Sequence, residues 1–274
     1  MITDIRRQFY FSKRLVLSVC ISLALASCTT QQVSVSGTSE APVNTSIQGA
    51  VDDAETVYKK AKQDKLAFYS LVFFPAAGED LAELKEMRLK YNPSKDGVFS
   101  RGYSAAEINA QSTLIKSKIE KAYVAKKGIH ENFQKVLDNQ AYVKTISISG
   151  FEEQYLDITE QINDLFKALE VKGRFEEEDK VGLLSNMHAF EVNVMSAKYH
   201  DKLLAKLKEI PEDSIPASFN NALLSLNNLK GKILADPRAI AVIEEAQAVA
   251  SKLLTRAESV YDEVVWVESV DSDN

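Results

Sequence analysis

Residues 151–173 read FEEQYLDITEQINDLFKALEVKG, and this stretch decides the fold class. Its apolar side chains recur at spacings of four and three residues, at Phe151, Tyr155, Ile158, Ile162, Leu165 and Leu169. Such spacing places them all on one face of an α-helix. Gly173 follows, and glycine commonly lies just past the end of a helix. The stretch therefore predicts an amphipathic helix that ends at Gly173.

The same helical period occurs on both sides of this stretch. Ser104, with Glu107 three residues later, has the pattern of a capping box, which begins a helix. An apolar seam with a spacing of seven residues follows, at Ile115, Ala122, Ile129, Val136 and Val143. Glycine and proline number only ten and six in 274 residues, as is typical of helical proteins. We therefore predict an all-α chain, an antiparallel multi-helix bundle formed as one unit or as two stacked helical subdomains.

Breaks in the period predict where other helices begin and end. A first helix is expected to end near Phe74, because Pro75 follows and proline does not continue a helix. The segment TISISG at 145–150 interrupts the pattern, and we expect the boundary between two subdomains there. Proline is favoured at the first helical position, so the last helix is expected to begin at Asp236-Pro237.

The first 28 residues have the three parts of a secretory signal. A basic flank, MITDIRRQFYFSKR, precedes an uncharged run, LVLSVCISLALAS, and small residues lead up to Cys28. The run is too short to span a bilayer as a helix, which takes roughly 20 residues. Cys20 lies inside the signal and would be removed with it. Cys28 would then be the one cysteine left, so that no disulfide could form within the chain.

The sequence Leu25-Ala26-Ser27-Cys28 resembles the lipobox of bacterial lipoproteins. The resemblance implies that the signal is cut before Cys28 and that Cys28 carries acyl chains such as palmitate, which anchor the protein to a membrane. In enterobacterial members of this family an aspartate after the cysteine favours the inner membrane. Thr29 therefore implies the outer membrane, facing the periplasm. The remainder of the chain is similar to helical lipoproteins of Gram-negative bacteria in composition and general layout alone.

These observations predict five segments. They are a signal peptide (1–27), a lipidated cysteine with a flexible tether (28–46), an N-terminal helical subdomain (47–147), a C-terminal helical subdomain (148–266) and an acidic tail (267–274).

The charge of the chain narrows the range of partners. The formal net charge is −6, and the signal carries more bases than acids, so its removal would leave a still more acidic protein. Negative charge disfavours binding to nucleic acid and to anionic lipid headgroups. We expect a protein partner in the envelope, and contact with the membrane through the lipid anchor.

Few residues suggest catalysis or metal binding. The three histidines are His130, His188 and His200, and none belongs to the Glu-x-x-His pairs of di-metal bundles. His188 lies three residues before Glu191, but it falls on an apolar stripe of a helix expected over 176–208, and we interpret it as packed in or beside the core. The chain has no Gly-x-Ser-x-Gly motif and no phosphate-binding glycine loop. We therefore expect no catalytic residue, no metal, no cofactor and no enzymatic activity.

Two apolar segments are candidates for partner binding. One is YSLVFF at 69–74, with Phe73 and Phe74, and the other is VVWVESV, with Trp266. Such residues either pack in a core or form an exposed docking surface. We expect a lipid-anchored protein that binds another envelope protein or supports envelope assembly. The alternative is a lipoprotein that holds a small or apolar molecule between its helices.

Overall fold

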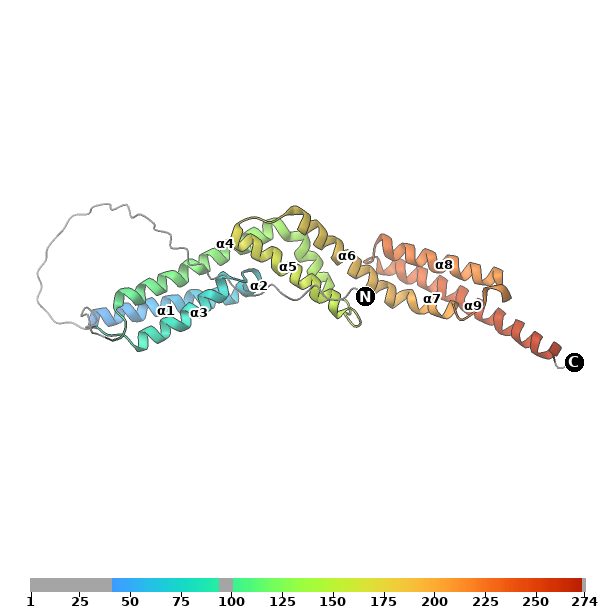
Figure 1. Cartoon of the computed structure of the whole chain (residues 1–274), viewed down its shortest axis with the longest axis horizontal. Coiled ribbons are helices and arrows are strands. Elements are labelled where there is room, and N and C mark those ends of the chain that lie inside the picture. Colours follow the sequence, from blue (N-terminus) through green and yellow to red (C-terminus); the bar gives the residue numbers. More distant parts are fainter. Residues whose placement is uncertain (1–40, 94–100, 273–274) are drawn as a thin grey trace, which may run out of the picture. The chain divides into compact units, whose positions relative to one another are not determined.

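All the regular elements in the described part of the chain are helical. The computed structural model (Figure 1) describes residues 41–93 and 101–272, which belong to one compact unit. The elements are α1 (Ala41–Gln63), α2 (Leu66–Tyr69), α3 (Phe73–Leu89), α4 (Ala105–Val143), α5 (Glu152–Lys172), α6 (Glu177–Tyr199), α7 (Asp201–Leu207), the 3-10 turn η1 (Glu212–Ser214), α8 (Pro216–Ala235) and α9 (Ile240–Ser272). The predicted all-α class is confirmed. The expected signal peptide and Cys28 lie outside the described residues.

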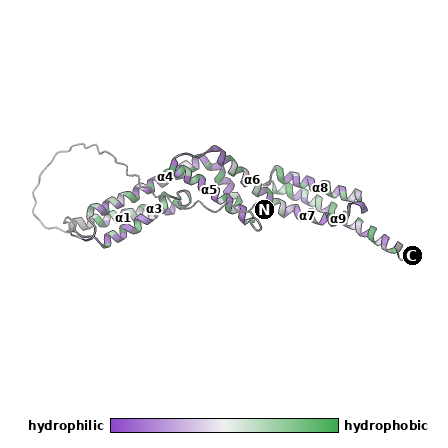
Figure 2. Ribbon diagram, viewed as in Figure 1, coloured by the Kyte–Doolittle hydropathy of each residue, from purple (hydrophilic) through white to green (hydrophobic). Residues whose placement is uncertain are grey.

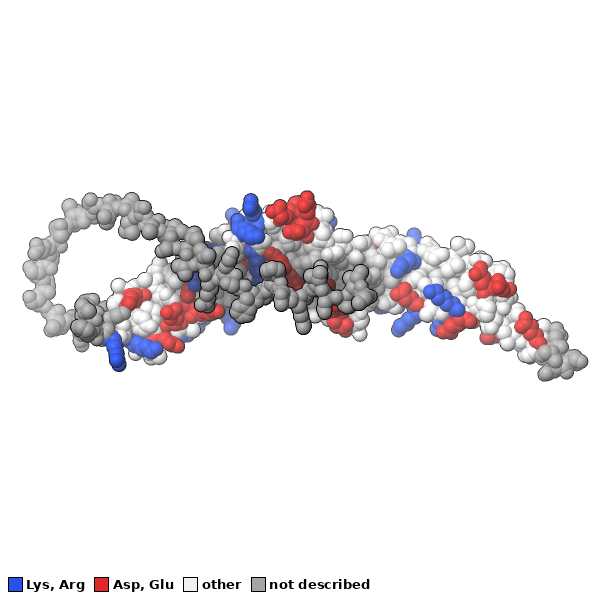
Figure 3. All heavy atoms as spheres, in the orientation of Figure 1, with Lys and Arg blue, Asp and Glu red and all other residues white. Residues whose placement is uncertain are grey.

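The amphipathic pattern that predicts the helices is visible on the structure. Hydrophilic and hydrophobic residues alternate along the helices (Figure 2), and charged side chains of both signs are spread over the surface in view (Figure 3). No helix among residues 41–93 and 101–272 is long and apolar enough to cross a membrane.

The buried side chains form three clusters that follow one another in the chain. The first core joins α1, α3 and the first half of α4, and the second joins the rest of α4 with α5 and the start of α6. The third core joins the end of α6 with α7, α8 and α9. Helices α4 and α6 therefore each change partners along their length.

This division differs from the expected boundary at 145–150. Ile148 of that segment packs against the second core, and Ile146 packs against both the second and the third, so the segment contacts two cores instead of separating two subdomains. The seam of α4 runs through both of its cores: Ile115 and Ala122 lie in the first, and Ile129 lies in the second. A seam of constant period gives no sign that the partner helices change, because the same side chains suit either partner.

Two helices have an end at the residue that the sequence predicts. In α4 the capping box is formed, since the Glu107 N–H donates to Ser104 Oγ at 3.3 Å and the Ser104 N–H donates to Glu107 Oε2 at 2.7 Å. Helix α4 departs from helical backbone angles at Phe133, which is buried in the second core one turn after Ile129. Helix α5 ends at Gly173, whose φ of 68° lies in the left-handed region that glycine tolerates best.

The N-terminal helices differ from the prediction. Helix α1 begins at Ala41, before the expected end of the tether at 46, and ends at Gln63, well before Phe74. Pro75 lies in the first turn of α3, where a missing backbone N–H costs no helical hydrogen bond. The same proline that would stop one helix therefore helps to begin another.

The C-terminal helix also has other bounds than those predicted. It begins at Ile240, because Asp236 and Pro237 belong to a turn in which the Arg238 N–H donates to Asp236 Oδ1 at 2.9 Å. It continues to Ser272, so residues 267–272 of the expected acidic tail are helical. The helix expected over 176–208 is interrupted at His200, which separates α6 from α7.

Candidate functional site

The aromatic segment at 69–74 is mostly a structural element. Phe74 is 5% exposed, and its ring stacks on Tyr58 with centroids 4.8 Å apart. Phe73 is half-buried against the first core, and the ammonium group of Lys121 lies 5.4 Å from its ring centroid. The prediction that Phe74 binds a partner is therefore wrong, because its side chain at the start of α3 is buried in the first core.

A buried carboxylate closes the junction between the first and second cores. Glu170 of α5 is 8% exposed and accepts backbone N–H groups from Leu71 at 2.8 Å, Val72 at 3.0 Å and Phe73 at 2.8 Å. The Ser70 hydroxyl donates to the same carboxylate, and Ser70 Oγ accepts the Phe74 N–H at 3.0 Å. The free N–H groups at the start of α3 are thus satisfied by a side chain from another helix.

A second buried glutamate closes the junction between the second and third cores. Glu191 of α6 is 1% exposed and accepts from Arg238 Nε at 2.7 Å and Nη2 at 2.5 Å. Arg238 also donates to Asn139 Oδ1 at 2.9 Å, and its guanidinium carbon lies 4.4 Å from the Tyr142 ring centroid. The hydrogen bonds to Glu191 raise the pKa of the Arg238 guanidinium. The ion pair holds the turn before α9 against α4 and α6.

A polar cleft with a volume of about 300 Å³ lies beside this ion pair. It is lined in part by Lys135, His188, Glu191 and Arg238. His188 is exposed, so the expectation that it packs in or beside the core is wrong. Within the described residues no three His, Cys, Asp or Glu side chains are grouped so as to hold a metal ion.

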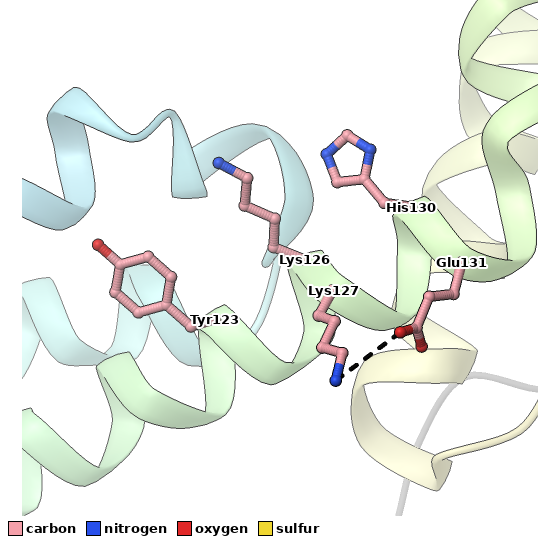
Figure 4. Close-up of a pocket in the computed structure, with 5 residues that line it drawn as sticks. All are labelled: Tyr123, Lys126, Lys127, His130 and Glu131. Carbon is pink, nitrogen blue, oxygen red and sulfur yellow. Dashed lines mark ion pairs between the residues drawn. The ribbon is translucent and has the colours of Figure 1, made fainter.

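A hollow of about 460 Å³ lies on the surface of α4 (Figure 4). Tyr123, Lys126 and His130 extend on one side of the helix, while Lys127 and Glu131 form an ion pair at 3.8 Å on another. The first three are held by internal contacts. Lys126 Nζ donates to the Asp64 carbonyl at 2.8 Å, and the His130 ring centroid lies 4.9 Å from that of Tyr69.

Tyr123 makes the hollow sensitive to alkaline pH. Its hydroxyl donates to Asp64 Oδ2 at 2.5 Å, and burial together with this bond raises the pKa of Tyr123 from 10.0 to about 12. The folded state therefore holds the phenolic proton more tightly than the unfolded state does. The contribution is present below pH 10 and is expected to be lost as the pH rises toward 12. Urea unfolding of the wild type and of Tyr123→Phe at several pH values should show a steeper alkaline loss for the wild type. Equal slopes would contradict the assignment.

The C-terminal end of α9 is the most exposed apolar segment that the sequence singles out. Helix α9 packs on α8 through side chains up to Val264, and in Figure 1 its last turns continue beyond α8. Trp266 is 67% exposed, and Val265, Val267 and Val270 are each more than 40% exposed. We call residues 265–270 the Trp266 patch. Unlike Phe74, Trp266 is exposed.

Sequence reasoning missed both buried glutamates, although one signal was present. Glu170 lies four residues after Phe166 and eight after Ile162, on the buried face of α5, and Glu191 lies four residues after the buried Met187 of α6. An acid in such a position requires internal donors. The chain nowhere indicates that these donors lie at residues 70–73 and 238.

Comparison with protein-family models, with curated proteins and with solved structures gives no match for this chain.

Proposed function

We propose that this chain is a lipid-anchored protein of the Gram-negative envelope that acts by docking another envelope protein. The lipobox at Leu25–Cys28 supports an anchor at Cys28, and Thr29 supports the outer membrane with the folded part in the periplasm. Two or three acyl chains attach a protein stably to a bilayer, whereas one chain alone binds weakly and reversibly.

The observation that carries the docking proposal is the exposure of the Trp266 patch. Tryptophan is enriched among the residues that contribute most to protein interfaces, because it is large, rigid and apolar. Leaving Trp266 and three valines in water on adjacent turns forgoes a hydrophobic gain of about 25 cal/mol per Å² of apolar surface. A partner that covered the patch would recover this gain.

Two further observations favour docking over turnover or ligand storage. The oxygens of Glu170 and Glu191 are occupied by internal donors, which supports a structural role for both. The large side chains around Phe133 in the second core, including Phe166, Phe190 and Met187, are fully buried and pack against one another. A ligand-holding lipoprotein would need such side chains to line an interior space.

Crosslinking in living cells tests the docking proposal. A photoreactive benzoyl-phenylalanine in place of Trp266 is expected to give a discrete adduct of higher mass. The same group in place of Leu89, which is 85% exposed on α3, is the matched control and should give none. The adduct should also be lost when Val270→Ser is added. Similar adduct patterns at both positions would overturn docking at the patch.

The anchor is tested separately. Cys28→Ala is expected to abolish fatty-acid labelling and to release the protein from the membrane fraction. Continued labelling, or a processed protein that stays with the membrane, would show that Cys28 is not the anchor.

A further inference from the structure

The segment of α9 that carries the Trp266 patch has charges of one sign only. After Arg256, residues 257–270 contain four acids and no base: Glu258, Asp262, Glu263 and Glu268. In the described part of the chain none of these carboxylates has an ion-pair partner. Acidic groups stand at this end of α9 on the face shown in Figure 3.

Helical geometry brings the apolar and acidic groups together. Trp266 and Val270 are four residues apart and Val267 and Val270 are three apart, so these three side chains form one stripe. Asp262 and Glu263 precede Trp266 by four and three residues, so they border the stripe one turn earlier. The patch is thus an apolar surface with an acidic rim.

We infer that the occupant of the Trp266 patch is a helical segment of another protein whose apolar face is flanked by lysine or arginine. This inference rests on the proposed docking function and adds the chemistry of the partner. A basic flank would complement the rim, steer association and select against acidic segments. A second copy would bring a second acidic rim to the same interface, and anionic lipid headgroups would be repelled for the same reason.

Trp266 is the one tryptophan of the chain, so its fluorescence reports on the patch directly. The full-length protein is purified into phosphatidylcholine nanodiscs, where the lipid carries no net charge. Two synthetic amphipathic helical peptides of equal length and identical leucine positions are added, one with lysine and one with glutamate at its polar positions. The lysine peptide should shift the Trp266 emission to the blue and protect it from acrylamide. The glutamate peptide should do neither.

Charge variants show whether the rim is responsible. Changing Glu258, Glu263 and Glu268 to Gln and Asp262 to Asn is expected to weaken binding of the lysine peptide by about tenfold, since each exposed ion pair contributes up to about 1 kcal/mol. The matched control neutralises the four acids at 176–179 and should change affinity by less than about twofold.

Each of the following results would overturn the inference. Equal binding of both peptides, or equal effects of the two charge variants, would remove the role of the acidic rim. A blue shift that grows with protein concentration alone would identify a second copy as the occupant. A blue shift caused by anionic vesicles without peptide would identify lipid. If the lysine peptide fails while crosslinking at 266 succeeds in cells, the docking proposal stands and the partner chemistry is wrong. If both fail, docking at the patch is itself wrong.

Discussion

Replacing Glu170 by Ala is expected to lower the free energy of unfolding by about 3–5 kcal/mol, which is a large part of the stability of a typical domain. The substitution removes the acceptor for three backbone N–H groups and one hydroxyl at the start of α3. Each hydrogen bond to a charged group contributes about 1.5–3 kcal/mol to the free energy of unfolding. The expected loss is smaller than the sum of four such bonds, because water can reach the N–H group of the exposed Val72.

Urea unfolding monitored by circular dichroism measures this loss. Glu160→Ala, at an exposed position of the same helix, is the matched control and should change stability by no more than about 0.5 kcal/mol. The free energy of unfolding of Glu170→Gln should lie between those of Glu170→Ala and Glu160→Ala. One oxygen of the glutamine still accepts hydrogen bonds, whereas its NH₂ group faces other donors. An effect of Glu170→Ala as small as that of Glu160→Ala would show that the carboxylate does not hold the junction.

Replacing Arg238 by Ala is expected to cost about 2–4 kcal/mol, because it leaves the Glu191 carboxylate buried without its partner. The expected loss of stability is smaller than for a fully buried ion pair, because the Arg238 side chain is 38% exposed and water can reach the carboxylate once it is removed. The same unfolding experiment applies, with Arg174→Ala at an exposed position as the control.

The double variant Glu191→Leu, Arg238→Met separates the cost of an unpaired buried carboxylate from the net stability that the ion pair contributes. Apolar side chains of similar volume often replace a buried ion pair at little cost, so most of the stability lost in Arg238→Ala should return. A double variant less stable than Arg238→Ala would mean that the pair contributes net stability that apolar packing cannot replace.

Helix formation could be predicted from the sequence because it depends on near neighbours. The period at 151–173 and the capping box at Ser104 concern residues within a few turns of one another, and both are found in the structure. The identity of the packing partners depends on residues far apart in the chain. Neither the change of cores within α4 nor the donors of Glu170, nearly a hundred residues earlier, has a local signal.

The sequence identified the two apolar segments of the candidate site but not which of them is exposed, because exposure also depends on distant parts of the chain. Phe74 and Trp266 both lie in dense apolar segments, yet one is buried and the other is exposed. The difference arises because Phe74 packs in the first core against Tyr58 of α1, whereas α9 is longer than the α8 that covers it. Whether a helix extends beyond its neighbour depends on the lengths of both helices, and the apolar period of one helix does not predict it.

The most direct test of docking is whether the Trp266 patch is covered in the cell. Ser269→Cys places a thiol within the Trp266 patch with little change of side chain, and Ser185→Cys places one at an exposed position of α6. Labelling by a maleimide that enters the periplasm is compared in cells and in the purified protein. Docking predicts that Ser269→Cys reacts much more slowly in cells than after purification, while Ser185→Cys reacts at the same rate in both. Unchanged reactivity of Ser269→Cys in cells would contradict the proposal that a partner occupies the patch.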